Sequence, residues 1–257
     1  MPFFNYRIWS RGPIRREEST SYAEYFDIGV HALAKVCPGN RFEVANEVIA
    51  LRLGQAINLP IPPGIALHKD GQLCFSSLIF TAGHRLPPAD TEGLVKADCR
   101  VACGIVVFDS WICNEDRHEK NLSFNEDTKE IFAFDHGMAM FGAEGVARLL
   151  NFNDSICIGR DQHAIALDIT SLFAFDEWNE RILAIPEYLI KDIVCDAIGS
   201  GIDIEQADEC IRFLLERRKK LRPLFFDNQR NHDVFPSVQQ LIQEITSRGD
   251  DWIEYQI

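Results

Sequence analysis

The sequence predicts an α+β fold in which a small β-rich part precedes a larger, mainly helical part. Two observations carry this prediction. Between residues 14 and 80, short runs of alternating, β-branched or aromatic residues are separated by turn residues, which is typical of strands. From residue 91 onward, apolar residues recur at helical spacing over several segments. A segment rich in Gly and Pro, residues 81–90, separates the two parts and predicts a linker.

The first part begins with three predicted strands, at residues 14–18, 22–28 and 31–36. Ser and Thr residues separate the first two, and Gly29 marks a tight turn before the third. These segments predict an antiparallel start to the sheet.

A helix is predicted over residues 42–57, where apolar residues recur about every 3.6 positions and Pro60 prevents continuation. Two more strands follow, at 64–69 and 72–80. Asp70-Gly71 between them is a strong hairpin signal. The resulting order is β-β-β-α-β-β.

The second part is predicted to begin with one long helix, residues 91–112. Short strands are expected at 122–124 and 131–135. The remaining helices are predicted at 177–184, 186–199, 204–221 and 235–247. We therefore expect a β-rich unit at 1–80, a linker at 81–90 and a helical unit at 91–257.

Composition excludes several classes of protein. The 257 residues carry a net charge of −13, which argues against direct binding to nucleic acid or to an anionic membrane. No charged and apolar leader opens the sequence, and no apolar run approaches ~18 residues, so we expect a cytoplasmic protein. The eight cysteines lie mostly in apolar runs without CxxC spacing, which predicts buried, reduced thiols.

Residues 109–137 carry the strongest functional signal. Asp116 is followed five residues later by Asn121, and Asp135 ends an apolar run just before Gly137. The spacing D-x-x-x-x-N is that of kinase catalytic loops. We assign Asp116 as the catalytic base that orients an attacking hydroxyl and takes its proton, and Asn121 and Asp135 as Mg²⁺ ligands.

Three further side chains of this loop carry charge or protons. His118 is a second catalytic candidate, because it could donate a hydrogen bond to the transferred phosphate, and a role in bracing the loop is equally open. Arg117 and Lys120 are predicted to be solvated loop charges, with contact to phosphate or pairing with Glu115 or Glu119 as the alternatives.

The β-rich part supplies candidate nucleotide-binding residues. Lys35 closes the third strand and Glu47 lies in the next helix, so a strand lysine held by a helix glutamate can face the α- and β-phosphates of ATP. Leu78 and Phe80, at the end of the last strand, are assigned to the same site. The loop between the first two strands lacks G-x-G-x-x-G, and the backbone of its short turn is expected to cradle phosphate instead. That loop is Glu18-Ser19-Thr20-Ser21, whose candidate residues are Ser19, Thr20 and Ser21, and a plain hairpin turn is the alternative.

These motifs resemble those of the HipA-like kinases, the serine/threonine kinase toxins of bacteria and their stand-alone relatives. The family's catalytic loop, N-x-D-x-H-x-K-N, is matched at every fixed position, and its D-x-G is matched at Asp135 and Gly137. ALAKV and NEVIALRLGQAINLPIPP are similar to its lysine strand and glutamate helix, with Asn58 where glycine is usual. The loop residues concerned are Asn114, Asp116, His118, Lys120 and Asn121.

The resemblance implies a bilobal protein-kinase-like fold, ATP and Mg²⁺ as cofactors, and a protein substrate phosphorylated on Ser or Thr. It also implies autophosphorylation within residues 19–21, which would switch the kinase off. A separate regulatory or antitoxin partner stays open, and toxin activity is not carried over.

Two alternatives remain. DRHEKN also looks like the D-R-H-x-x-N of phosphoinositide kinases, which keeps a lipid or small-molecule substrate open. The second alternative is a nucleotide-binding pseudokinase that acts as an interaction module.

Overall fold

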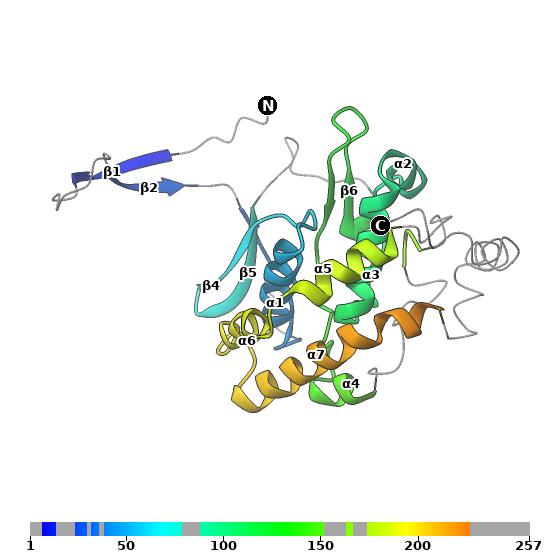
Figure 1. The fold of residues 1–257 in the computed structure, drawn as a ribbon. Helices are drawn as coiled ribbons and strands as arrows, with labels where there is room; N and C mark the ends of the chain where they lie inside the picture. Colours follow the sequence, from blue (N-terminus) through cyan, green and yellow to red (C-terminus); the bar gives the residue numbers. More distant parts are fainter. Residues whose placement is uncertain are drawn as a thin grey trace, which may run out of the picture.

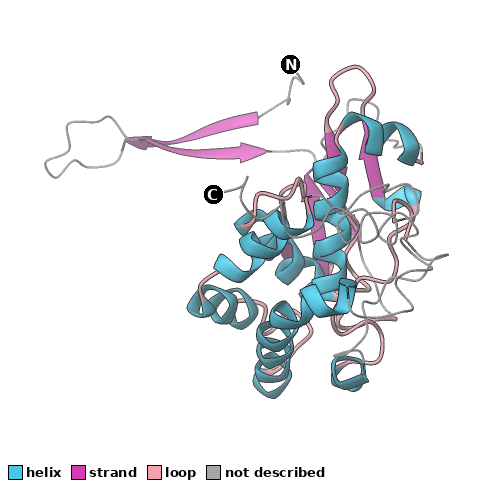
Figure 2. Ribbon diagram, turned by 45° about the vertical axis from the view of Figure 1, so that its right-hand side comes forward, coloured by secondary structure: helices cyan, strands magenta, loops and turns pink. Residues whose placement is uncertain are grey.

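The structure is a computed structural model of the whole chain. It describes residues 7–13, 24–29, 32–35, 39–78, 88–151, 163–166 and 174–226. In these residues, small antiparallel sheets precede a mainly helical part (Figures 1 and 2). The mixed α and β class predicted from the sequence is confirmed.

The first two strands form an antiparallel pair. Strand β1, Arg7–Pro13, precedes the strand predicted at 14–18, which lies outside the described residues. Strand β2, Glu24–Gly29, pairs with β1 from Arg7 opposite Gly29 to Pro13 opposite Glu24. The β1–β2 pair forms a two-stranded sheet of its own.

The next sheet carries the predicted lysine. Its strand order is β3-β5-β4, and all neighbours are antiparallel. The three strands are β3, Ala32–Lys35; β4, Gly64–Lys69; and β5, Gln72–Leu78. The hairpin between β4 and β5 turns at Asp70 and Gly71, which have φ values of 53° and 78°. Positive φ at both positions is what an Asp-Gly hairpin provides.

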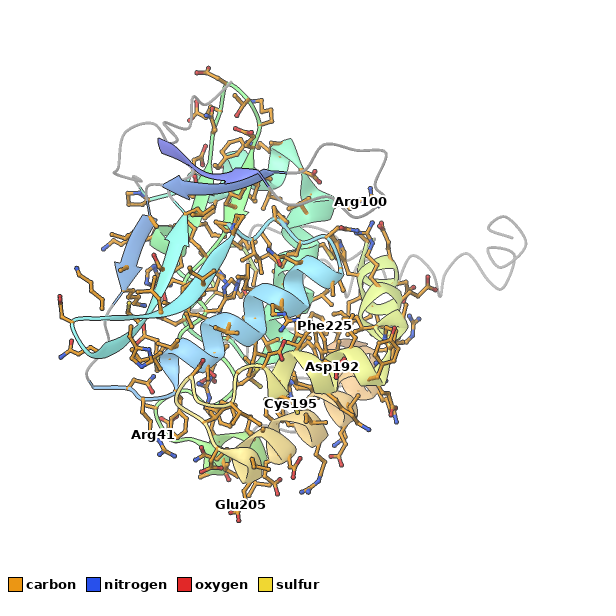
Figure 3. All side chains as sticks on the ribbon, turned by 90° about the vertical axis from the view of Figure 1, so that its left-hand side faces the viewer. Arg41, Arg100, Asp192, Cys195, Glu205 and Phe225 are labelled. Carbon is orange, nitrogen blue, oxygen red and sulfur yellow. The ribbon has the colours of Figure 1, made fainter. Side chains whose placement is uncertain are left out.

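Helix α1, Glu43–Ala56, connects β3 to β4 and is buried over most of its length. It packs against β4 and β5 on one side and against helix α6, Glu187–Cys195, on another. Figure 3 views α1 and α6 side by side, with Asp192 and Cys195 on α6. Arg52 of α1 forms an ion pair with Asp196 just after α6. Helix α1 is therefore held between the sheet and the helical part.

The helix predicted at 91–112 is two helices, α2, Thr91–Ala97, and α3, Cys99–Ile112. The break is at Asp98, whose carboxylate accepts a hydrogen bond from Val101 N at 2.9 Å and caps α3. An aspartate in this position satisfies one of the free N–H groups at a helix start. Helix α3 is buried from Ala102 to Ile112 and forms the centre of the core.

Three further helices pack against α3 or beside it. Helix α3 lies close to Trp178 at Gly104, where an added Cβ would be 2.3 Å from Trp178 Cε2. The helices are α4, Val146–Asn151; α5, Phe175–Ala184; and α7, Ile204–Phe226. The helices predicted near 177–184, 186–199 and 204–221 are confirmed with shifted ends, while residues 235–247 lie outside the described residues.

A short hairpin lies between α3 and α4. Its strands are β6, Leu122–Phe124, and β7, Ile131–Ala133, paired with Leu122 opposite Ala133. This hairpin brings the segment before β6 beside the segment after β7. The predicted loop residues therefore lie at its base.

No described helix combines the length and the apolar character needed to cross a bilayer. Five cysteines in the described ranges are free: Cys74, Cys99, Cys103, Cys195 and Cys210. Cys113 is disulfide-bonded, so the prediction of reduced thiols is wrong for this residue. The predicted linker at 81–90 lies mostly outside the described residues, and the domain boundaries stay predictions.

Candidate active site

The predicted catalytic loop begins where α3 ends. Cys113 caps the helix in a left-handed conformation, with φ of 51°, and turns the chain back toward α3. Asn114 N donates to Asp109 O at 2.8 Å, and its side-chain Nδ2 donates to Asp109 Oδ1 at 2.9 Å. Asn114 Oδ1 accepts from Asp116 N at 3.4 Å. Asn114 therefore directs the start of the loop, and this explains the asparagine two residues before Asp116.

Asp116 and His118 face each other at the surface. The distance between Asp116 Oδ1 and His118 Nε2 is 4.0 Å, and their side chains are 50% and 44% exposed. His118 Nδ1 accepts from Lys120 N at 3.2 Å, so Nε2 carries the proton in the neutral ring. His118 thus braces the loop through one nitrogen and presents a donor beside Asp116 through the other. Both roles weighed from the sequence are available to it.

Asn121 is buried at the end of a 3-10 turn, Glu119–Asn121. Its Nδ2 donates to Asp116 O at 2.8 Å, which fixes the amide orientation. Because Nδ2 donates to Asp116 O, the side-chain oxygen Oδ1 is the atom that can bind a cation. An amide oxygen and a carboxylate are suitable ligands for Mg²⁺.

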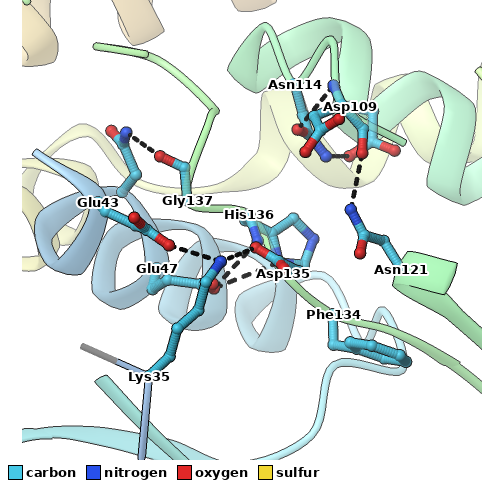
Figure 4. Close-up of polar contacts among 12 residues, drawn as sticks. Lys35, Glu43, Glu47, Asp109, Asn114, Asn121, Phe134, Asp135, His136 and Gly137 are labelled. Carbon is cyan, nitrogen blue, oxygen red and sulfur yellow. Dashed lines mark hydrogen bonds and ion pairs between the residues drawn. The ribbon is translucent and has the colours of Figure 1, made fainter. Parts of the chain in front are cut away.

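Asp135 follows β7 in the left-handed conformation, with φ of 58°. Its Oδ1 accepts from Lys35 Nζ at 2.6 Å, and Lys35 Nζ is also 2.5 Å from Glu43 Oε1 (Figure 4). Burial alone would lower the pKa of Lys35, but the hydrogen bonds to Asp135 and Glu43 raise it above the ordinary value. The lysine is therefore cationic and bridges the strand, the helix and the predicted metal ligand.

The predicted pairing of Lys35 with Glu47 is corrected by these contacts. The carboxylate of α1 in contact with the lysine is that of Glu43, one helical turn earlier. Glu47 Oε2 instead accepts from His136 N at 3.1 Å, directly after Asp135. Burial, and then repulsion from Asp135, raise the pKa of Glu47 to about 7. Glu43 was missed from the sequence, although its i, i+4 spacing with Glu47 places both on one helix face.

Position 137 requires glycine because this segment lies very close to α1. A Cβ at this position would lie 2.4 Å from Glu43 Cγ, well inside contact distance. Gly137 O accepts from Asn46 Nδ2 at 2.7 Å, and Asn46 Oδ1 accepts from Phe141 N at 3.3 Å. The D-x-G segment is therefore attached to α1 through Asn46, beside Glu43 and Glu47.

Arg117 departs most clearly from the sequence prediction. It was predicted to be a solvated loop charge, but its side chain is fully buried and forms an ion pair with Asp109 of α3. Burial would raise the pKa of Asp109, but the charge of Arg117 and the hydrogen bonds from His163 and Arg117 lower it far below its ordinary value. Asp109, a carboxylate within an apolar helix, was the available signal, because a fully buried charge needs a partner.

Arg148 of α4 joins the segment after Gly137 to the catalytic loop. Its Nη2 donates to Cys113 O at 2.8 Å and to Glu115 Oε2 at 2.9 Å. Its Nη1 donates to Met138 O. The loop is thus supported from α4 as well as from α3.

The structure brings Lys35, Glu47 and Asp135 together, and places Asp116, His118 and Asn121 on one loop. Leu78 ends β5 opposite Ala32 and is half-buried. Phe80 and the turn Ser19, Thr20 and Ser21 lie outside the described residues, so their assignments stay predictions.

Comparison with solved structures gives a similar fold. The chain matches the Helicobacter pylori proinflammatory kinase CtkA with a TM-score of 0.56 and 13% identity, over 92% of this chain and 98% of that one. It also matches HipA in a toxin–antitoxin complex of HipA, HipB and operator DNA from Shewanella oneidensis. That match has a TM-score of 0.41 and 12% identity, over 77% of this chain and 60% of that one, and is too weak to support an argument.

No family model and no curated protein matches the sequence. At 13% identity, the match to CtkA shows a shared fold and nothing finer. The expectation of a kinase-like fold is confirmed at that level. Residue roles depend on the geometry described above.

Proposed function

We propose that the protein is a kinase that transfers the γ-phosphoryl group of ATP, with Mg²⁺, to a Ser or Thr hydroxyl of a protein. The observation that carries the proposal is the contact of Lys35 Nζ with Asp135 Oδ1 at 2.6 Å. It joins the predicted phosphate-binding lysine to the predicted metal ligand although the two are 100 residues apart in the sequence. The bilobal arrangement expected for such a fold is part of the proposal.

In this mechanism Asp116 orients the acceptor hydroxyl and takes its proton. Its carboxylate is half exposed at the surface of the loop and is therefore accessible to a substrate. His118 Nε2–H faces the same carboxylate and can donate to an oxygen of the transferred group. Lys35 contacts the phosphates of the nucleotide while Glu43 holds its ammonium group in place. These residues position the substrates, which is the protein's main contribution to phosphoryl transfer.

Asn121 and Asp135 would hold Mg²⁺ through oxygen atoms, and the fit rests on the donor set. Asn121 Nδ2 is used by Asp116 O, which leaves the amide oxygen as ligand. Asp135 offers carboxylate oxygens, and its Oδ1 already accepts a hydrogen bond from the ammonium group of Lys35. When bound, Mg²⁺ would neutralise charge that develops on the phosphate oxygens.

The choice of a protein substrate is supported by the sequence resemblance to HipA-like serine/threonine kinases. Autophosphorylation at Ser19, Thr20 or Ser21 is part of the same proposal, because a phosphate there would add about two negative charges near the phosphates of ATP. The alternatives, a lipid or small-molecule kinase and a pseudokinase, are outcomes of the same experiment.

The experiment is incubation of the purified chain with γ-labelled ATP and MgCl₂, with a lysate, a phosphoinositide mixture or no acceptor. The proposal predicts label on protein Ser or Thr for the wild type, and a loss of at least about 100-fold for Asp116→Asn. Label on lipid alone would favour the lipid-kinase alternative. Equally low label for wild type and Asp116→Asn, with nucleotide still bound, would favour the pseudokinase.

A further inference from the structure

We propose that Arg117 is a positioning residue that holds the two proposed metal ligands, Asn121 and Asp135, at a fixed separation. The inference rests on the proposed function, because it concerns the same metal site. It gives Arg117 no contact with nucleotide or with the reacting atoms. Arg117 acts only through the backbone of the segments that carry the two ligands.

The orientation of the guanidinium is fixed from α3. Arg117 Nε donates to Asp109 Oδ2 at 2.8 Å, and Nη2 donates to Oδ1 at 3.0 Å. Both side chains are fully buried. Asp109 also accepts from Asn114 Nδ2 at 2.9 Å and contacts His163 Nε2 at 3.1 Å. A two-point contact of a planar guanidinium with an anchored carboxylate leaves the third nitrogen in one direction.

That third nitrogen contacts both ligand-bearing segments. Arg117 Nη1 donates to Asn121 O at 2.8 Å and to Phe134 O at 2.6 Å. Phe134 N also donates to Asn121 O at 3.1 Å. Because Asp135 directly follows Phe134, Arg117 Nη1 reinforces this backbone contact by joining the backbone of one ligand to the residue before the other. Figure 4 shows Asn121, Phe134 and Asp135 on these two segments.

The geometry of the arginine is separable from its charge. A lysine at 117 keeps a cation beside Asp109, but its ammonium cannot contact both carboxylate oxygens and also both carbonyl groups in the same arrangement. We therefore expect Arg117→Lys to weaken Mg²⁺ binding about 10- to 100-fold, which is the usual effect of losing a residue that orients metal ligands. Nucleotide binding without metal should not change, because Arg117 is buried beneath the loop.

The test measures binding of a non-hydrolysable ATP analogue by calorimetry over a series of MgCl₂ concentrations. The readout is the MgCl₂ concentration that gives half of the maximal increase in analogue affinity. Arg217→Lys is the matched control, since Arg217 is also fully buried and its Nε donates to a backbone carbonyl, Ser110 O, at 2.7 Å. In addition, phosphoryl transfer by Arg117→Lys should recover when MgCl₂ is raised.

The expected result is a rise of about 10- to 100-fold in this MgCl₂ concentration for Arg117→Lys, with little change for Arg217→Lys. If this MgCl₂ concentration is unchanged in Arg117→Lys, or rises equally in Arg217→Lys, the proposed role of Arg117 is wrong. If Arg117→Lys does not fold, the neutral pair Asp109→Asn with Arg117→Gln takes its place with the same expectation. If MgCl₂ does not change the affinity of the wild type for the analogue, the proposed function itself is contradicted.

Discussion

Replacing Gly137 with alanine should displace Glu43 and thereby disturb its contact with Lys35. The added Cβ would lie 2.4 Å from Glu43 Cγ and 2.9 Å from Glu43 Cδ. An ordinary carbon contact is about 3.5–4.0 Å, so Glu43 must move by roughly 1 Å. Glu43 is packed tightly, since its side chain is only 11% exposed. Overpacking of this kind costs about 1–3 kcal/mol of the free energy of unfolding.

The assay is urea unfolding of the wild type, Gly137→Ala, Glu43→Ala and the double variant. Glu43→Ala removes the atoms that the new methyl group would contact. Gly137→Ala should therefore lower the free energy of unfolding clearly less in the Glu43→Ala background than in the wild type. Glu43→Ala alone should cost at most about 1 kcal/mol, because Lys35 is 42% exposed and solvent screens the pair. Gly39→Ala is the control, since its added Cβ meets nothing within 4 Å. An equal loss of stability from Gly137→Ala in both backgrounds would show that the loss does not arise from contact with Glu43.

Two further predictions concern α1 and α3. The pKa of Glu47 is raised to about 7 in the folded protein, so the native state keeps this proton to higher pH than the unfolded chain does. Stability should therefore fall as pH rises from about 4.5 to above 7, by up to about 3 kcal/mol, and Glu47→Gln should remove that part of the dependence. Urea unfolding at pH 5 and pH 8 measures this, and an identical pH dependence in both proteins would contradict it. Gly104→Ala should destabilise the core by about 1–3 kcal/mol, because its Cβ would lie 2.3 Å from Trp178 Cε2. Thermal melting checks this, and an unchanged melting temperature would show that α3 and α5 pack less closely.

The elements that could be predicted from the sequence are those with local signals. The Asp70-Gly71 turn, helix α1 and the pair β4–β5 follow from turn residues and periodicity. Strand β4 has its predicted bounds, α1 is one residue shorter at each end, and β5 is present up to Leu78, where the described residues end. The break at Asp98 also had a local signal, an aspartate that can cap the helix three residues before Val101. It was missed because the apolar pattern continues through it.

The parts of the site that escaped prediction depend on tertiary packing. Whether Lys35 meets Glu43 or Glu47 depends on how α1 is rotated against the sheet, and both residues share one helix face. The burial of Arg117 depends on Asp109, eight residues earlier, being inside the core rather than at the surface. Local patterns place residues on elements, but the contacts between elements decide which charges pair.

In the proposed mechanism, Asp116 takes the proton of the acceptor hydroxyl while Asp135 holds the metal. The most direct measurement compares Asp116→Asn and Asp135→Asn for Mg²⁺-dependent binding of the ATP analogue and for phosphoryl transfer. We predict that Asp116→Asn keeps metal-dependent binding and loses transfer, whereas Asp135→Asn loses both. Equal loss of binding in the two variants, with both folded, would contradict this division of roles.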